Sequence, residues 1–225
     1  MREIVLDTET TGLDPHSGHR IVEIACLELE NHVQTGQSFQ CYLNPEREMP
    51  EEAFRVHGLG DDFLAQQPRF AEKVEDFLAF IGEAPLVIHN AEFDLRFLNA
   101  ELRLCGLEEL DRERAVDTVA LARQRFPGAQ VSLDALCRRF EIDNSARTFH
   151  GALLDCQLLA EVYLELRGGR QPGLVLSAEK AAKAEQAQPR SARPPRPHAP
   201  SAAELEAHRA LLEKITDPIW KDGGV

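Results

Sequence analysis

The sequence lacks the cysteine pairs from which a disulfide framework or a zinc site is built. Its five cysteines are an odd number, they are widely spaced, and no two form a CxxC pair. Disulfide-bonded secreted domains and structural zinc sites both need paired or clustered cysteines. We therefore expect a protein of the reducing cytosol, without a disulfide framework or a zinc centre.

Long apolar runs and a secretory signal are also missing. No stretch approaches the roughly 20 apolar residues that span a bilayer. The opening residues, MREIVLDTET, lack the basic region, apolar core and small-residue cleavage site of a signal peptide. We expect a cytoplasmic protein with no membrane partner.

Positive charge is scarce. The 25 Lys and Arg residues face 38 Asp and Glu residues, which gives a formal net charge of -13 at pH 7. A protein that holds nucleic acid through a broad basic surface has the opposite balance. If the substrate is a polyanion, the protein must recruit cations to hold it.

The chain changes character after its first 169 residues. Up to that point apolar strand-like runs alternate with helix-periodic segments, whereas residues 177–200 are rich in Pro and Ala and hold almost no large apolar side chain. Such a segment buries too little surface to offset its ordering entropy. We expect a folded domain over residues 1–169, a disordered linker over residues 177–200 and a short C-terminal helix within residues 201–225. Ser201 and Glu204 form a capping box at the start of that helix.

Strands come first in the predicted domain and then alternate with helices. Three apolar runs in close succession, over residues 2–8, 20–30 and 38–44, predict an antiparallel meander. A short apolar strand over residues 84–90 leads directly into a helix. The predicted helices cover residues 70–81, 91–104, 115–125, 132–140 and 151–166. This order predicts an α/β domain with a mixed sheet.

Two carboxylates, Asp7 and Glu9, stand at the end of the first strand, in DTETTG. Residues two apart in a strand share a face, and like charges on one face repel each other unless a cation lies between them. One or both could instead point to solvent, which is the commoner outcome for a DxE pair. The TTG turn that follows favours a binding site, because its glycine allows the backbone to approach a ligand closely.

Each of two predicted helices carries an Asp where its apolar stripe calls for a large apolar residue. Asp94 stands four residues before Leu98, and Asp155 stands four before Leu159. An Asp at such a position is often solvated or paired with an arginine, and Arg96 is a candidate partner for Asp94. With the pair on the first strand, the four carboxylates would favour Mg²⁺ or Mn²⁺ over zinc. Two such ions about 4 Å apart form a clamp for phosphodiester hydrolysis.

A base for such chemistry is offered by His150, which precedes the helix of Asp155 in HGALLD. An imidazole titrates near neutral pH and can accept a proton from an attacking water. A surface histidine at a helix start is the alternative. Other histidines in loops or polar segments are expected to be surface residues: His16, His19, His32, His198 and His208.

The motifs DTETTG, HNAEFD and HGALLD occur in the order found in the DEDDh 3′ to 5′ exonucleases, and the chain resembles that family. Within it, the chain is similar in particular to the proofreading epsilon subunits of bacterial DNA polymerase III. Segments such as VHGL, LVIHNAEFD and SLDALCRRFEIDNS extend the resemblance over residues 3–169. The resemblance implies an α/β, ribonuclease H-like mixed sheet flanked by helices.

The resemblance also implies roles for individual residues. Two divalent cations, Mg²⁺ or Mn²⁺, would be held by Asp7, Glu9, Asp94 and Asp155, with His150 as the general base. Glu52 and His57 match positions that contact the 3′-terminal nucleotide, together with three of the metal ligands, Asp7, Glu9 and Asp155. From the sequence alone Glu52 and His57 would be ordinary loop residues.

The tail holds two candidates for partner binding. Within residues 170–176, Gln171, Leu174 and Leu176 have the spacing of the short peptide that docks replication proteins on the sliding clamp, although a packed coil after a helix fits it too. The amphipathic helix that follows Ser201 is short, and such helices usually need a partner surface. The resemblance implies that this partner is the catalytic (alpha) subunit of DNA polymerase III, with the linker as a flexible tether.

Together these features predict an exonuclease that removes mispaired 3′-terminal deoxynucleotides from single-stranded or frayed DNA ends during replication. Two alternatives stay open. One is an RNA-trimming exonuclease of the same superfamily, and the other is a structural replisome subunit whose nuclease site is vestigial. The tail favours replication, because an RNA-trimming enzyme needs neither a clamp peptide nor a polymerase-binding helix.

Overall fold

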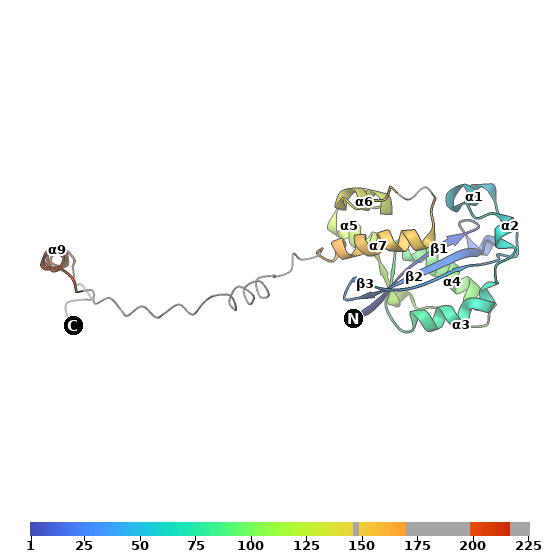
Figure 1. Ribbon diagram of the computed structural model, residues 1–225, viewed down its shortest axis with the longest axis horizontal. Coiled ribbons are helices and arrows are strands. Elements are labelled where there is room, and N and C mark those ends of the chain that lie inside the picture. Colours follow the sequence, from blue (N-terminus) through green and yellow to red (C-terminus); the bar gives the residue numbers. More distant parts are fainter. Residues whose placement is uncertain (146–148, 170–198, 217–225) are drawn as a thin grey trace, which may run out of the picture. The chain divides into compact units, whose positions relative to one another are not determined.

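The structure is a computed structural model that describes residues 1–145, 149–169 and 199–216. The chain divides into two compact units, Met1–Gly173 and Leu174–Val225. The N-terminal unit holds the sheet and its flanking helices (Figure 1). Nearly all of the linker predicted over residues 177–200 falls outside the described residues.

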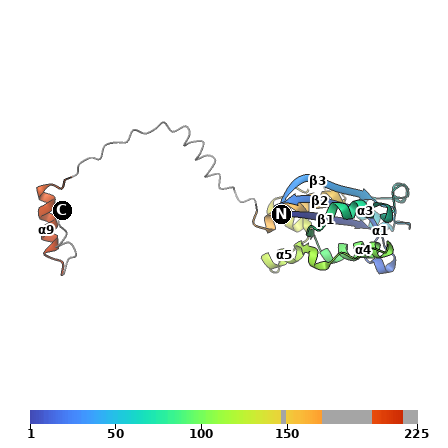
Figure 2. The same ribbon diagram turned by 90° about the horizontal axis from the view of Figure 1, so that it is seen from below.

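Five strands form one mixed sheet in the order β3-β2-β1-β4-β5. The predicted antiparallel meander consists of β1 (Arg2–Thr10), β2 (Ile21–Glu30) and β3 (Val33–Tyr42), which run side by side in Figure 2. On the other side of β1, β4 (Leu86–Ile88) and β5 (Ala115–Asp117) continue the sheet in parallel. The strand β1, which carries Asp7 and Glu9 near its C-terminal end, is therefore the central strand of the sheet.

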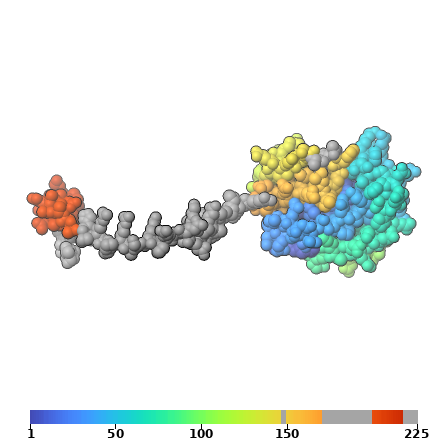
Figure 3. All heavy atoms as spheres, in the orientation of Figure 1, coloured from blue at the N-terminus to red at the C-terminus, as the bar shows by residue number. Residues whose placement is uncertain are grey.

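Helices cover both faces of the sheet. On the face of Ile4 and Leu6 lie α3 (Phe70–Ile81) and α4 (Ala91–Leu104). The opposite face, which carries Val5, packs against α5 (Thr118–Arg125), α6 (Leu133–Phe140) and α7 (Ala152–Leu166). Figure 3 shows the atoms of α7 directly against those of the meander. Successive β1 residues thus face different helices, as the alternation of a strand requires.

The other described elements lie outside these two helical layers. They are α1 (Glu51–His57), α2 (Asp61–Leu64), the 3₁₀ turns η1 (Pro15–Ser17) and η2 (Arg112–Arg114), and α9 (Ala202–Leu212) in the C-terminal unit. Within the described ranges, every helix is too short or too polar to span a bilayer.

The sequence prediction is wrong at two places in the N-terminal unit. Residues 115–117, expected to begin a helix, form the edge strand β5, and the helix begins only at Thr118. The Asp117 carboxylate caps that helix by accepting a hydrogen bond from the Val119 N–H at 2.9 Å. The second error concerns the stretch expected to be a loop around Glu52 and His57, which forms α1 and ends at Gly58 in a left-handed conformation, φ 73°.

In the C-terminal unit, α9 begins at the predicted capping box. Ser201 Oγ accepts a hydrogen bond from the Glu204 N–H at 3.3 Å, and Glu204 Oε2 accepts one from the Ser201 N–H at 2.8 Å. Leu205, Leu211 and Ile215 are 43%, 56% and 39% exposed. The described helix is therefore capped locally and leaves large apolar side chains open to solvent.

Candidate active site

The central strand delivers Asp7 and Glu9 to the α7 side of the sheet. Val5 packs on that side, and Asp7 and Glu9 continue the same alternate series toward the end of β1. Asp7 is half-buried and Glu9 is 8% exposed. Both carboxylates therefore share one face, where they are largely withdrawn from solvent.

Asp94 reaches the same end of β1 from the first turn of α4. Its Oδ1 accepts two hydrogen bonds from Thr8, one from the backbone N–H at 3.1 Å and one from Oγ1 at 2.7 Å. Burial and, to a smaller extent, the charge of Asp117 raise the pKa of Asp94 to about 7, against the lowering effect of the Thr8 bonds. Arg96 is exposed and donates instead to the Leu13 carbonyl at 3.1 Å, so it is not the partner that the sequence suggested.

The start of α7 contributes the remaining two predicted residues of the site. Asp155 lies in its first turn and is 4% exposed, while the His150 side chain, just before the helix, is half-exposed. Nδ1 of His150 lies 3.6 Å from Oδ2 of Asp155. One ligand atom from each of Glu9, His150 and Asp155 lies within 4.8 Å of the others. These three groups are close enough to surround one cation, because metal–oxygen bonds of roughly 2.0–2.6 Å are the norm.

All five predicted catalytic and metal-binding residues line one cavity of about 330 Å³. They are Asp7, Glu9, Asp94, His150 and Asp155, and His89, Phe93 and Asp134 also contribute to the wall. Neither lysine nor arginine is among the described residues that line it. Several carboxylates gathered in one site repel each other and favour a bound cation. This donor set, rich in carboxylate oxygens and without a thiolate, fits Mg²⁺ or Mn²⁺.

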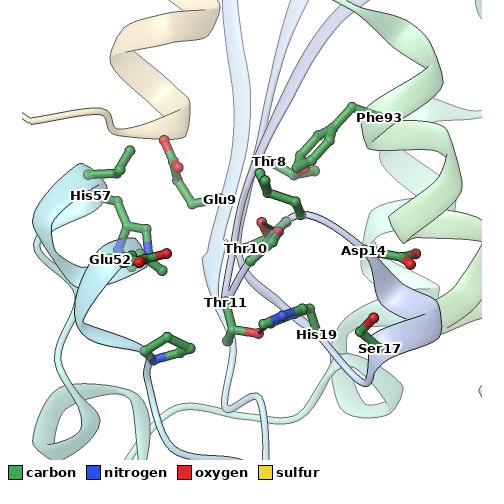
Figure 4. Close-up of a pocket in the computed structure, with 15 residues that line it drawn as sticks. Thr8, Glu9, Thr10, Thr11, Asp14, Ser17, His19, Glu52, His57 and Phe93 are labelled. Atoms are coloured by element: carbon green, nitrogen blue, oxygen red, sulfur yellow. Dashed lines mark hydrogen bonds between the residues drawn. The ribbon is translucent and has the colours of Figure 1, made fainter.

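A second pocket, of about 530 Å³, adjoins the first. Glu52 and His57 line it from α1, the residues that end β1 line another side, and Phe93 contributes from α4. Figure 4 shows Glu52 and His57 on one side of the end of β1 and Phe93 on the other. Thr8, Glu9 and Phe93 belong to the walls of both cavities, so one ligand can occupy the two together.

The imidazole of His57 is buried in the wall of this second pocket, with 6% of the residue exposed. Nδ1 accepts a hydrogen bond from the Leu59 N–H at 3.1 Å, which leaves the ring proton on Nε2. Burial lowers the pKa of His57, the Thr10 backbone partly restores it, and the charge of His150 lowers it again. Among the described residues, Nε2 has no hydrogen-bond partner, so the Thr10 contact falls short of a full hydrogen bond. A buried N–H in this state suits an acceptor on a bound ligand.

His19 is half-buried and is not the surface residue that its loop position predicts. Its ring lines the second pocket, and Nδ1 lies 3.1 Å from Thr11 Oγ1. A Cβ on Gly12 would come within 2.3 Å of the His19 ring, so any other residue in the TTG turn would displace this ring. His32 is likewise not a simple surface residue, because its Nδ1 lies 2.6 Å from Glu3 Oε2. No local pattern marks either histidine, since each contact depends on the fold.

The predicted clamp-binding residues Gln171, Leu174 and Leu176 lie outside the described residues, as do residues 217–225. The described structure brings together the predicted catalytic, metal-binding and nucleotide-binding residues in two adjoining cavities.

Comparisons with known proteins identify the family of the chain. The family model RNase_T, described as Exonuclease, matches residues 4–163. DNA polymerase III subunit epsilon of Rickettsia typhi is 56% identical over 174 residues, 76% of each chain. The Rickettsia conorii subunit is 47% identical over 222 residues, 96% of each chain. The subunit of Escherichia coli K12 is 49% identical over 176 residues, 75% of this chain and 72% of its own.

Solved structures show the same fold. Exonuclease X in complex with 5′ overhanging duplex DNA has a TM-score of 0.55 at 25% identity, over 78% of this chain and 92% of its own. The nuclease domain of 3′hExo, a DEDDh family member bound to rAMP, has a TM-score of 0.63 at 21% identity, over 74% and 92%. The chain belongs to the exonuclease family of the matching model, and within it to the epsilon subunits of DNA polymerase III.

Proposed function

We propose that this exonuclease removes mispaired 3′-terminal deoxynucleotides during DNA replication. One observation carries the proposal: the four predicted metal-binding carboxylates, from β1, α4 and α7, and the His150 imidazole, just before α7, line a cavity that adjoins a pocket large enough for a nucleotide. The first cavity suits the scissile phosphate, and the second suits the terminal nucleoside. The relatives named DNA polymerase III subunit epsilon support a role in replication.

In this proposal Asp7, Glu9, Asp94 and Asp155 hold two divalent cations, Mg²⁺ or Mn²⁺. When bound, the cations would offset the charge of the phosphodiester and make water a better nucleophile. This arrangement explains how a chain with a net charge of -13 can bind a polyanion. The hydrogen bonds from Thr8 fix the orientation of the Asp94 carboxylate.

His150 is the proposed general base. Its half-exposed imidazole accepts the proton of the attacking water, and the Asp155 carboxylate, 3.6 Å away, stabilises the imidazolium that forms. The attack breaks the bond between phosphorus and the 3′ oxygen of the preceding nucleotide. The product is a nucleoside 5′-monophosphate, and the shortened strand keeps a free 3′ hydroxyl.

Glu52 and His57 are proposed to hold the terminal nucleotide. The buried Nε2–H of His57 donates to an acceptor on that nucleotide, and the Glu52 carboxylate accepts a hydrogen bond from its sugar. Only an unpaired end can enter two adjoining pockets, so a mismatched terminus, which costs less to melt, enters more readily than a paired one.

The test compares four labelled substrates at the same concentration of Mg²⁺: a primer–template with a matched 3′ end, one with a mismatched 3′ end, single-stranded DNA and single-stranded RNA. We expect the mismatched DNA end to be shortened faster than the matched end, with release of nucleoside monophosphates and complete inhibition by EDTA. RNA cleaved as fast as single-stranded DNA would favour the RNA-trimming alternative. An inactive purified protein would favour a structural subunit.

The tail is proposed to bind two partners, the catalytic (alpha) subunit of DNA polymerase III through residues 201–225 and the sliding clamp through Gln171, Leu174 and Leu176. The exposed apolar residues of α9 support the first contact. A pull-down that compares the full chain with a truncation after Gly169 tests both contacts. If the truncated chain binds polymerase or clamp as tightly as the full chain, that part of the proposal fails.

A further inference from the structure

A second buried carboxylate lies directly opposite Glu9 on the neighbouring strand. In the register of β1 and β2, Glu9 pairs with Glu23, which is 2% exposed. Like charges directly opposite each other destabilise an antiparallel pair. Burial raises the pKa of Glu23, and the charge of Asp155 raises it further. Since Ala25 and Leu27 continue the same face as core residues, packing alone would favour an apolar side chain at position 23.

Glu23 reaches the first turn of α7. Its Oε2 accepts a hydrogen bond from the buried Ala152 N–H at 3.2 Å. The first N–H groups of a helix have no acceptor within the helix. The N-cap residue of α7 is Gly151, which has no side chain to supply one. A carboxylate from β2 therefore caps this helix, and its negative charge also suits the positive end of the helix dipole.

The other oxygen of Glu23 is held from the opposite side. Oε1 accepts a hydrogen bond from Gln40 Nε2 at 2.7 Å, and the same nitrogen lies 3.1 Å from the Tyr42 hydroxyl. Both residues belong to β3. The hydrogen bonds from Gln40, Ala152 and Tyr42 lower the pKa of Glu23 and so oppose the effect of burial. The Glu23 carboxylate is thus held by a hydrogen bond to each of its two oxygens, one from β3 at the edge of the sheet and one from the start of α7.

The same segment has a second long-range tether. The His150 N–H donates to the Val56 carbonyl at 3.0 Å. The two tethered N–H groups, those of His150 and Ala152, are two residues apart, and Asp155 follows within the next turn. The position of the imidazole and of the Asp155 carboxylate relative to Glu9 therefore depends on contacts with α1 and β2.

We propose that Glu23 is a positioning residue of the exonuclease site. It holds the start of α7 so that His150 and Asp155 meet Glu9 in the cavity, and it acts through the Ala152 backbone. This inference rests on the function proposed above, because the groups that it positions are the proposed base and a proposed metal ligand.

The test uses three variants of the full chain. Glu23→Met keeps the length of the side chain and removes both acceptors, whereas Glu23→Gln keeps one acceptor for the Ala152 N–H. Glu3→Met is the matched control, because Glu3 is also 2% exposed and accepts from the Tyr163 hydroxyl at 2.7 Å, at the other end of β1. Each variant is assayed for kcat and KM on single-stranded DNA, for Mn²⁺ affinity by calorimetry and for thermal unfolding.

We expect Glu23→Met to lower kcat and Mn²⁺ affinity by roughly 10- to 100-fold, the usual cost of removing a group that orients a metal site. Glu23→Gln should retain most of both, and Glu3→Met should lose stability while kcat and Mn²⁺ affinity stay at the wild-type level. If Glu23→Met does not fold, Glu23→Asp replaces it, because the shorter carboxylate keeps the charge but withdraws from Ala152.

Two results would overturn the inference. One is a folded Glu23→Met or Glu23→Asp with wild-type kcat and Mn²⁺ affinity. The other is an equal loss in Glu3→Met, which would make the effect one of general stability. A wild-type chain without metal-dependent nuclease activity would instead refute the proposed function, and the Mn²⁺ titrations would still show whether Glu23 shapes the site.

Discussion

Buried carboxylates at the two ends of β1 have opposite surroundings. At its start, Glu3 is 2% exposed and is surrounded by donors, the Tyr163 hydroxyl at 2.7 Å and His32 Nδ1 at 2.6 Å. At its end, on the same face, Glu9 lies opposite Glu23 and close to Asp155. At the start of β1, hydrogen-bond donors surround one carboxylate, whereas at its end further carboxylates lie close to Glu9.

The difference separates a structural carboxylate from a functional one. A buried charge is costly unless it is paired or hydrogen-bonded, and side chains of the fold meet that need at Glu3. The bidentate pair of Arg20 with Glu101, at 2.7 Å for both bonds, meets it in the same way. At the end of β1 the fold adds further carboxylates, which is favourable only if a cation or a cationic substrate group joins them. Buried carboxylates that lie next to each other therefore indicate a cation-binding site, even where no sequence motif is known.

The largest effect that separates the two ends is expected for Asp7→Ala. This change removes a metal ligand, so nuclease activity should fall close to the background, while the fold persists because Asp7 is only half-buried. The loss should exceed the roughly 10- to 100-fold that removal of a supporting group costs. Hydrolysis of single-stranded DNA in Mg²⁺ and thermal unfolding measure both quantities.

The control for Asp7→Ala is the wild-type chain in excess EDTA. It should be as inactive as the variant, and Mg²⁺ should restore the wild type alone. Substantial nuclease activity that survives both the substitution and EDTA would show that the metal mechanism is wrong.

A smaller but still large loss is expected for His150→Gln. The glutamine cannot accept the proton of the attacking water, and general-base catalysis contributes roughly 10²- to 10⁴-fold. We expect a loss near the lower limit, because hydroxide replaces the base as the pH rises. The pH profile of kcat should therefore keep climbing in the variant where the wild type has levelled. Identical profiles for the two proteins would exclude His150 as the base.

The sequence predicts the acidic end of β1 better than the rest of the site, because each carboxylate there breaks a local pattern. Asp94 and Asp155 occupy positions in apolar helix stripes, and both are buried in the structure as those stripes require. Asp7 and Glu9 are identified as a pair because residues two apart in a strand lie on the same face. Local periodicity is enough to find such residues, even when it does not show that they meet.

The remainder depends on contacts between distant segments. Glu23 looks like an ordinary polar residue of a strand, since its importance comes from the register with β1 and from an N–H group 129 residues away. The edge strand β5 is only three residues long, too short for a period to show, and it is defined by its pairing with β4. The roles of Glu52 and His57 come from the family resemblance, because α1 carries no mark of a binding site in its sequence.

A moderate effect is expected at the acidic end of β1, where the carboxylates make the free energy of unfolding of the metal-free protein depend on pH. Burial raises the pKa of Asp94 from 3.8 to about 7, so the folded chain keeps a proton that the unfolded chain releases. Between these pH values the unfolded state binds fewer protons, and the free energy of unfolding therefore falls as the pH rises and levels off above about 7. Urea unfolding in EDTA at a series of pH values measures the slope.

Asp94→Asn is the matching variant for this measurement. It cannot titrate, so its stability should decline less than that of the wild type over the same pH range. Mg²⁺ should stabilise the wild type more at pH 8 than at pH 5, because only ionised carboxylates bind the cation. Parallel curves for the two proteins in EDTA would show that Asp94 is not the group responsible.

The smallest effect is expected at the other end of the strand, for Tyr163→Phe. The change removes only the hydroxyl that donates to Glu3 Oε1, and Tyr163 is 1% exposed, so no solvent replaces the lost bond. A buried acceptor left without its donor costs about 1–3 kcal/mol of stability. Activity and Mn²⁺ affinity should stay at the wild-type level, because the bond lies at the start of β1 and the site at its end. A loss of Mn²⁺ affinity in this variant would mean that the two ends are coupled through the strand, and that the division between a structural and a functional end does not hold.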